Sequence, residues 1–151
     1  PKRVYAYASV LTDTTMSDVD SYYFVESTFI NVILDGFQLN GGIELLEDDD
    51  VFEIEFNARG NADKSCKLTL AVVINAVFDV NGKLTSGTII PGSEDPVETS
   101  DQGTLTAYVS GHSLSGVELK KNEKVALIMK ASVINTIFAP TLLNASIHKF
   151  R

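Results

Sequence analysis

Cysteine, tryptophan and proline are scarce in this sequence. Its 151 residues include one cysteine, Cys66, no tryptophan and four prolines. No apolar run approaches the roughly 18 residues that a membrane-spanning helix needs, so no membrane partner is predicted. A single cysteine excludes a disulfide within the chain, and the position of Cys66 at the start of an expected strand predicts a small buried side chain.

Basic residues are also in the minority. Twenty Asp and Glu residues against twelve Lys and Arg give a formal net charge of −8 at pH 7. A field of this sign repels phosphate backbones, and no local cluster of basic residues is dense enough to reverse it. Glycine-rich phosphate-binding loops are absent as well. The sequence therefore predicts no nucleic-acid partner.

The length of the chain is that of one domain. A chain of 151 residues can bury roughly two-thirds of its unfolded surface, which is enough for a core without disulfides or metals. No repeat or interdomain linker is visible, so residues 1–151 are expected to form a single domain. The sequence begins at Pro1 rather than Met, which is typical of a processed or trimmed N-terminus or of a fragment.

Alternating apolar and polar residues predict β-strands along most of the chain. Residues 51–58 alternate most cleanly, so this strand should have one wet face. The Asn81-Gly82 dipeptide predicts a hairpin with a type I′ turn, which requires positive φ at both positions. About eight to ten strands and no convincing helix predict an all-β antiparallel sandwich or barrel. The residues of 51–58 expected to face inward are Phe52, Ile54, Phe56 and Ala58.

The segment at residues 125–129, VALIM, has no polar residue on either face of a strand. A strand that faces water on one side alternates, so this run must be covered on both faces. The core supplies one cover. Our hypothesis for the other is a second copy of the same chain.

This strand follows a turn within residues 114–130, a segment that resembles the penultimate hairpin of jelly-roll domains of the tumour necrosis factor and complement globular-head type. The family pattern is a hydrophobic strand, Lys-Gly-Asp and a second hydrophobic strand, and here Lys121-Asn122-Glu123 replaces Lys-Gly-Asp. Asn122 keeps the turn chemistry because asparagine tolerates a left-handed backbone, and Glu123 keeps the acid. Residues 145–150, ASIHKF, resemble the short last strand of the family. The resemblance implies a jelly-roll sandwich.

Domains of that family pack as three-fold assemblies with their first and last strands near the axis. Such an assembly would cover the surplus apolar surface of the first strand, the last strand and residues 125–129. We therefore predict a homotrimer. The alternative is a thick sandwich core within one chain that buries the same residues. The residues predicted at the trimer interface are Tyr5, Tyr7, Ile128 and Phe150.

Acidic residues are concentrated between positions 44 and 55, where hard cations such as Ca²⁺ could find several carboxylate oxygens. The group lacks the spacing of a dedicated calcium loop, and charged runs at strand corners are usually solvated or prevent edge pairing. Residues 79–82, DVNG, lack the distal Glu of such a loop. Calcium binding around Asp48, Asp49 and Asp50 stays an open alternative, and no metal or other cofactor is predicted. The group comprises Glu44, Glu47, Asp48, Asp49, Asp50, Glu53 and Glu55.

Catalytic groups are sparse. His112 and His148 have no third ligand at a recognisable zinc spacing, and the serines near His112 have no nucleophile-elbow sequence. Glu53 and Glu55 are the only pair of carboxylates that would suit a sugar-active enzyme. No catalytic residue is predicted, and the protein is expected not to be an enzyme. The serines concerned are Ser110, Ser113 and Ser115.

One functional prediction and two alternatives follow. The chain is expected to be a structural protein of a virion, such as a bacteriophage fibre, capsid-decoration or receptor-binding module, which it resembles in its Thr, Ser and Asn content and its lack of disulfides. Its partners would be copies of itself, other virion proteins and a host-surface glycan or protein. Loops at residues 12–21, 92–103 and 135–144 would make that host contact. The alternatives are an extracellular complement-head-like binding module and a jelly-roll lectin or sugar-active enzyme.

Overall fold

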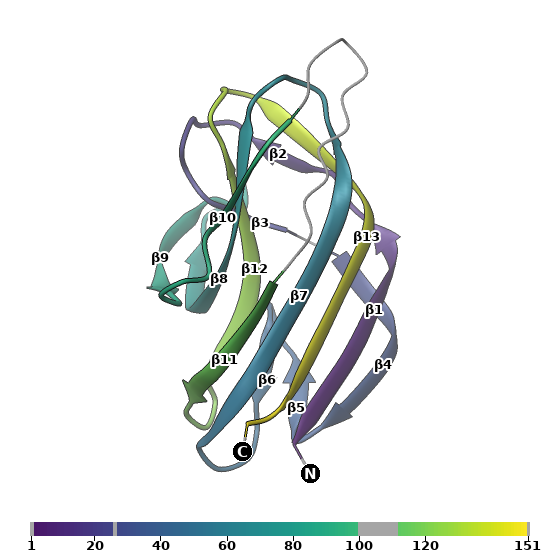
Figure 1. The fold of residues 1–151 in the computed structure, drawn as a ribbon, viewed down its shortest axis with the longest axis vertical. Helices are drawn as coiled ribbons and strands as arrows, with labels where there is room; N and C mark the ends of the chain where they lie inside the picture. Colours follow the sequence, from purple (N-terminus) through teal and green to yellow (C-terminus); the bar gives the residue numbers. More distant parts are fainter. Residues whose placement is uncertain (1, 26, 100–111, 151) are drawn as a thin grey trace.

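The computed structural model describes residues 2–25, 27–99 and 112–150, and for residues 7–11, 27–31 and 112 it describes the backbone alone. This part of the chain forms thirteen strands and no helix, which confirms the predicted all-β class. It accordingly contains no helix of the length and apolarity needed to cross a membrane. The strands form two antiparallel sheets that pack face to face (Figure 1).

The first sheet contains β1 (Arg3–Leu11), β2 (Thr14–Met16), β4 (Ser27–Asp35), β7 (Asp50–Ala62), β11 (His112–Leu119) and β13 (Thr136–Lys149). Its order is β11-β7-β13-β1-β4, with β2 paired to the beginning of β13. The second sheet contains β3 (Tyr23–Phe24), β5 (Phe37–Leu39), β6 (Ile43–Leu45), β8 (Lys67–Phe78), β9 (Leu84–Ile89), β10 (Asp95–Glu98) and β12 (Lys124–Ala131). Its order is β10-β8-β12-β6-β5, with β3 on β12 and β9 on β8.

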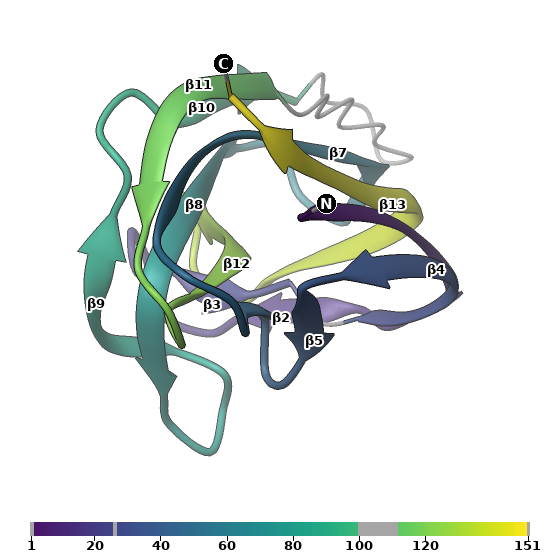
Figure 2. The same ribbon diagram turned by 90° about the horizontal axis from the view of Figure 1, so that it is seen from below.

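The chain crosses repeatedly from one sheet to the other. From β7 in the first sheet it passes to β8, β9 and β10 in the second, returns for β11, crosses to β12 and ends with β13 in the first. Figure 2 shows these crossings end-on. Long antiparallel strands that alternate between two facing sheets in this way form a jelly roll, as predicted.

The main core fills the space between the sheets. In β7, Phe52, Ile54, Phe56 and Ala58 are buried there, while Glu53 on the other face remains partly exposed, which confirms the predicted wet face. Cys66 is buried as expected, and burial raises the pKa of its thiol.

The strand at residues 125–129 is covered on both faces, as its sequence predicts, but both covers belong to the same chain. Val125, Leu127 and Met129 face the main core, and Ala126 and Ile128 face a second, smaller cluster. The hypothesis that a second copy covers this strand is therefore wrong, because β3 and the β8–β9 hairpin bring enough apolar side chains to do so. The residues that pack over the second cluster are Tyr22, Phe24, Ala76, Phe78, Leu84 and Ile89.

The turn between β11 and β12 confirms the role predicted for Asn122, whose φ is 72°. Glu123 supports this turn through its side chain, because its Oε1 accepts a hydrogen bond from the Lys120 N–H at 2.8 Å. Residues 114–130 are not a hairpin, however. β11 pairs with β7 and β12 pairs with β8, so the turn carries the chain from one sheet to the other.

The hairpin predicted at Asn81-Gly82 is present, with Phe78 opposite Leu84, but its turn is of another type. Of the two residues Asn81 and Gly82, only Gly82 has a positive φ, at 80°. The Gly82 N–H donates to the Asp79 carbonyl at 3.0 Å, and the Asp79 N–H donates to the Lys83 carbonyl at 2.9 Å. The Asp79 carboxylate also accepts backbone N–H groups of the loop, so an aspartate-stabilised turn replaces the expected type I′ turn.

The three segments predicted as recognition loops all contain strands. Residues 12–21 include β2, residues 92–103 include β10, and residues 135–144 lie mostly in β13; residues 100–103 are outside the described part of the chain. Pro140 lies within β13 and does not interrupt this strand. Pro140 sits beside a register shift of β13 opposite Gly60, where the missing side chain makes room for it.

Candidate functional site

The outward face of the first sheet brings two large apolar side chains together at the surface. The pairing of β13, β1 and β4 places Ser146, Tyr5 and Ile33 in one row across the sheet. Tyr5 and Ile33 each leave 48% of their surface exposed. Exposed apolar residues at directly opposite positions of neighbouring strands are typical of a surface that another molecule covers.

Paired polar side chains flank this row. His148 Nε2 lies 3.0 Å from Glu53 Oε2, and the Nε–H of Arg3 donates to Asp35 Oδ2 at 3.0 Å. Because these groups already have partners within the face, a second surface could cover the face without leaving them unpaired. A third pair, on the far side of the row, joins Asn57 Nδ2 to Asn144 Oδ1 at 2.8 Å.

The residues predicted at a trimer interface do not all lie on this face. Tyr5 lies on it. Phe150 follows the end of β13 and leaves 40% of its surface exposed. Tyr7 pairs through its backbone with Asn144, and its side chain is outside the described part of the structure. Ile128 is 0% exposed within a single chain, because the second cluster encloses it. It is therefore not part of the candidate face.

Asp50 ties both ends of the chain to the start of β7. One carboxylate oxygen, Oδ2, accepts a hydrogen bond from Lys2 Nζ at 3.1 Å and lies 3.4 Å from Lys149 Nζ. The other, Oδ1, accepts the Val51 N–H at 2.9 Å. The hydrogen bond from Val51, followed by that from Lys2, lowers the pKa of Asp50.

The remaining acidic residues considered for calcium have separate partners. Glu44 Oε1 accepts a hydrogen bond from Asn40 at 3.0 Å, and Asp49 Oδ1 accepts the Lys121 N–H at 2.9 Å. Within the described ranges, no group of three or more His, Cys, Asp or Glu side chains is placed to hold a metal ion. The acidic residues that are close together in the sequence therefore do not converge on one point in the structure.

The groups considered for catalysis are also dispersed. His148 is paired with Glu53, and Ser113 and Ser115 are exposed on β11. Ser110 and the His112 side chain lie outside the described part of the structure. Glu53 and Glu55 both point outward from β7, with Glu53 engaged by His148, so the pair considered for sugar cleavage lies on the wet face of the first sheet.

Comparison with known proteins identifies the type of jelly roll. No protein-family model matches the chain, and no curated protein matches it. Among solved structures, Eiger TNF from S. frugiperda is similar with a TM-score of 0.67 and 8% sequence identity, over 99% of this chain and 92% of that chain. Murine APRIL at pH 8.0 is similar with a TM-score of 0.56 and 9% identity, over 99% of this chain and 100% of that chain. The fold is a tumour necrosis factor-like jelly roll.

Within this tumour necrosis factor-like fold, the residue that sequence reasoning missed is Ile33. It lies in a largely apolar segment, residues 27–35, where neither face of the strand stands out as polar. Its exposure becomes visible only through the register of β4 on β1, which aligns Ile33 with Tyr5. The alternation of β1, with Val4 and Ala6 buried, was the available signal for the outward position of Tyr5.

Proposed function

We propose that this protein is a non-enzymatic binding module that works as a homotrimer, with the outward face of the first sheet as the contact between copies. The observation that carries the proposal is the exposed pair Tyr5 and Ile33, which lies among polar side chains that are already paired. The resemblance to the tumour necrosis factor type, whose domains form three-fold assemblies, supports three copies rather than two.

A three-fold arrangement requires two different contact surfaces on each copy. In a ring of three copies, the contact face of one copy meets a different surface of the next, and the ring closes without further growth. Apolar side chains at the contact supply the hydrophobic stabilisation, while the paired polar groups around them restrict the relative orientation. Tyr5 and Ile33 provide the apolar contact. The pairs Glu53–His148 and Arg3–Asp35 provide the polar groups that restrict orientation.

Light scattering on the purified chain tests this proposal. We expect a molar mass three times that of the 16.4-kDa chain. The variant Ile33→Asp should dissociate the assembly, because it places a charge in an apolar contact. Ile134→Asp is the matched control, since Ile134 is 56% exposed in the turn before β13, away from this face.

Two outcomes contradict parts of the proposal. A monomer at micromolar concentrations would overturn the assembly. A trimer that is insensitive to Ile33→Asp would overturn the choice of face. Folding of each variant is checked by its near-ultraviolet circular dichroism.

The setting we propose for the trimer is a virion, where it would act as a fibre, capsid-decoration or receptor-binding module beside other virion proteins. The Thr, Ser and Asn content and the absence of a possible disulfide within the chain support this setting. The alternative is an extracellular binding module of the complement-head type. Antibodies raised against the chain should label intact particles, and labelling confined to a secreted, particle-free fraction would favour the alternative.

A further inference from the structure

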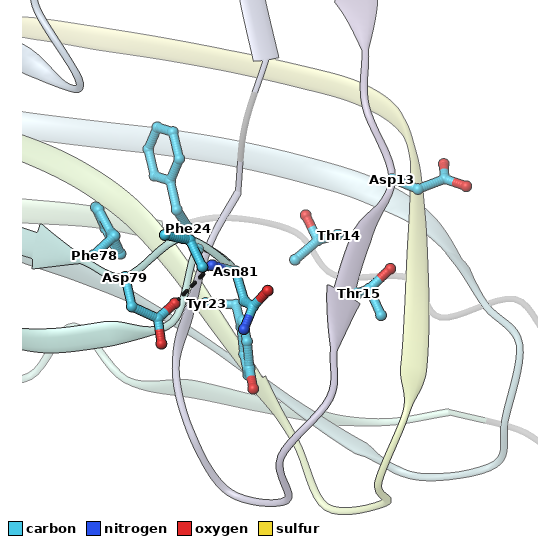
Figure 3. A pocket seen from close by; sticks show the side chains of 10 residues that line it. Asp13, Thr14, Thr15, Tyr23, Phe24, Phe78, Asp79 and Asn81 are labelled. Atoms are coloured by element: carbon cyan, nitrogen blue, oxygen red, sulfur yellow. Dashed lines mark hydrogen bonds between the residues drawn. The ribbon is translucent and has the colours of Figure 1, made fainter.

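A pocket of about 350 Å³ opens between β2, β3 and the turn that joins β8 to β9 (Figure 3). Its volume is near the lower end of the roughly 300–1,000 Å³ found for ligand pockets, so it suits a small ligand. None of the residues that line it belongs to the proposed contact face.

Thr14 supplies the observation that points to a ligand. Thr14 is 5% exposed, and its side chain projects from β2 toward the pocket (Figure 3). Its Oγ1 is the one buried side-chain oxygen or nitrogen in the described part of the chain that has no hydrogen-bond partner. A buried hydroxyl without a partner lowers stability, and a ligand that pairs with it removes that cost.

The turn opposite Thr14 contributes polar groups in a fixed arrangement. The Asp79 Oδ1 accepts the N–H groups of Asn81 at 2.8 Å and Lys83 at 3.0 Å, which holds the turn in shape. This leaves the Asn81 carboxamide exposed at the pocket, between Asp79 and Thr14 in the view of Figure 3. The carboxamide can both donate and accept hydrogen bonds.

An aromatic wall and an acidic rim complete the pocket. Phe24 and Phe78 line it, and their ring centroids lie 4.9 Å apart. Asp13, immediately before β2, is exposed and lines the pocket. The wall can pack against carbon–hydrogen groups of a ligand, and the carboxylate can accept hydrogen bonds from ligand hydroxyls.

We propose that this pocket binds one neutral sugar ring, such as the terminal unit of a glycan. The hydroxyl groups of a neutral sugar donate and accept hydrogen bonds, which matches Thr14, Asn81 and Asp13, and the apolar face of the ring matches the aromatic wall. Because the Thr14 Oγ1 is itself buried, a rotation of the side chain about its Cα–Cβ bond would bring the hydroxyl to the sugar. The inference rests on the proposed role as a binding module and names the ligand class of that module.

Two other ligand classes fit less well. Asp13 and Asp79 give the pocket negative charge, which opposes an anionic sugar or a phosphate. A metal ion would require more ligands, and no group of three His, Cys, Asp or Glu is placed to hold one in the described ranges.

Nuclear magnetic resonance titration of the isotope-labelled protein tests the site. The probes are the methyl glycosides of glucose, galactose, mannose and N-acetylglucosamine. We expect at least one of them to shift amide signals of residues 13–15, 23–24 and 78–82 in a saturable way. Thr14→Val should weaken that binding about tenfold, because it removes one hydrogen-bonding group. The same variant should raise the melting temperature, because it also removes the unpaired buried hydroxyl.

The matched control is Thr136→Val. Thr136 is also buried, at 0% exposed, but its hydroxyl donates to the Val133 carbonyl at 2.7 Å. This variant should lower the melting temperature and leave sugar binding unchanged. Asn81→Ala, at an exposed position, is a second test that does not disturb the core, and it should weaken binding as well.

The failure of this inference is distinguishable from the failure of the proposed assembly. If none of the four glycosides shifts the pocket signals, or if Thr14→Val binds as tightly as the unaltered protein, the sugar site is overturned. Light scattering on the same samples reports the mass of the assembly, so a loss of sugar binding and a loss of assembly are measured separately.

Discussion

Gly60 and Pro140 face each other where β7 pairs with β13, and a β-carbon on Gly60 would lie 2.7 Å from the Pro140 Cα. It would also collide with the Ala139 carbonyl oxygen. Two long strands of the first sheet thus approach so closely at this point that only glycine fits. The contact lets β13 continue through a proline that would otherwise end it.

Replacing this glycine should strain the sheet. We expect Gly60→Ala to lower the free energy of unfolding by about 1–3 kcal/mol, because the backbone of β13 must move to admit one methyl group. Urea denaturation followed by circular dichroism measures the change. Gly41→Asn is the control, since nothing lies within 4 Å of a β-carbon there and asparagine tolerates its φ of 64°.

Substitutions of Asn122 should separate residues that tolerate positive φ from residues that do not. Asn122→Val places a branched side chain at positive φ and should cost about 1–2 kcal/mol, whereas Asn122→Gly should be neutral or stabilising. Asn81→Val is the informative comparison. Asn81 does not have positive φ, so this change should cost less than Asn122→Val in the same urea titration. Equal costs would mean that Asn81 does adopt the type I′ conformation.

Asp50 should make stability depend on pH in the acid range. Folding lowers the pKa of this carboxyl below its ordinary value of 3.8, so its stabilising effect is complete above that value. The effect is lost as the pH falls through the folded-state pKa. We therefore expect Asp50→Asn to melt at a lower temperature than the unaltered protein at pH 7, and the difference to shrink toward pH 2.

A neighbouring acid provides the control for Asp50. Lys2 Nζ also donates to the backbone carbonyl of Asp48 at 2.9 Å, a contact that does not involve the Asp48 carboxylate. Asp48→Asn should therefore change the melting temperature less than Asp50→Asn at pH 7. A gap between Asp50→Asn and the unaltered protein that widens in acid would contradict the assigned direction of the pKa shift.

Ile128 should matter for folding and not for assembly. Ile128→Ala removes a fully buried side chain from the second cluster and should cost about 2–5 kcal/mol of unfolding free energy. Ile134→Ala, at a position that is 56% exposed, should change stability by no more than about 0.5 kcal/mol. The mass of the assembled protein should be the same for both variants. If the Ile128→Ala variant folds but no longer assembles, the conclusion that Ile128 is not part of the interface would be wrong.

The parts of the fold that could be predicted from sequence are those with strong local patterns. The alternation of residues 51–58 identifies which side of β7 is buried, and the apolar run at residues 125–129 shows that β12 is covered twice. Asn122 could be predicted because a turn with positive φ admits few residue types.

The parts that could not be predicted depend on contacts between distant segments. β2 is three residues long, and its pairing with the beginning of β13 holds it in place. The second cover of β12 comes from β3 and the β8–β9 hairpin, which no local pattern assigns to that position. Likewise, the exposure of Ile33 and the unpaired hydroxyl of Thr14 depend on which strands become neighbours.

The antiparallel pairing of β1 with β13 places Arg3 beside His148, so the first and last strands run next to each other and the two ends of the chain meet at one end of the sandwich (Figure 1). A short glycine-serine linker could join them. New termini could be opened at the exposed residue Ser65, in the bend beyond Ala62 at the far end of β7 from Asp50, which binds Lys2 and Lys149. Such a circularly permuted protein would retain both sheets. It would also carry any fused cargo at the opposite pole of the molecule.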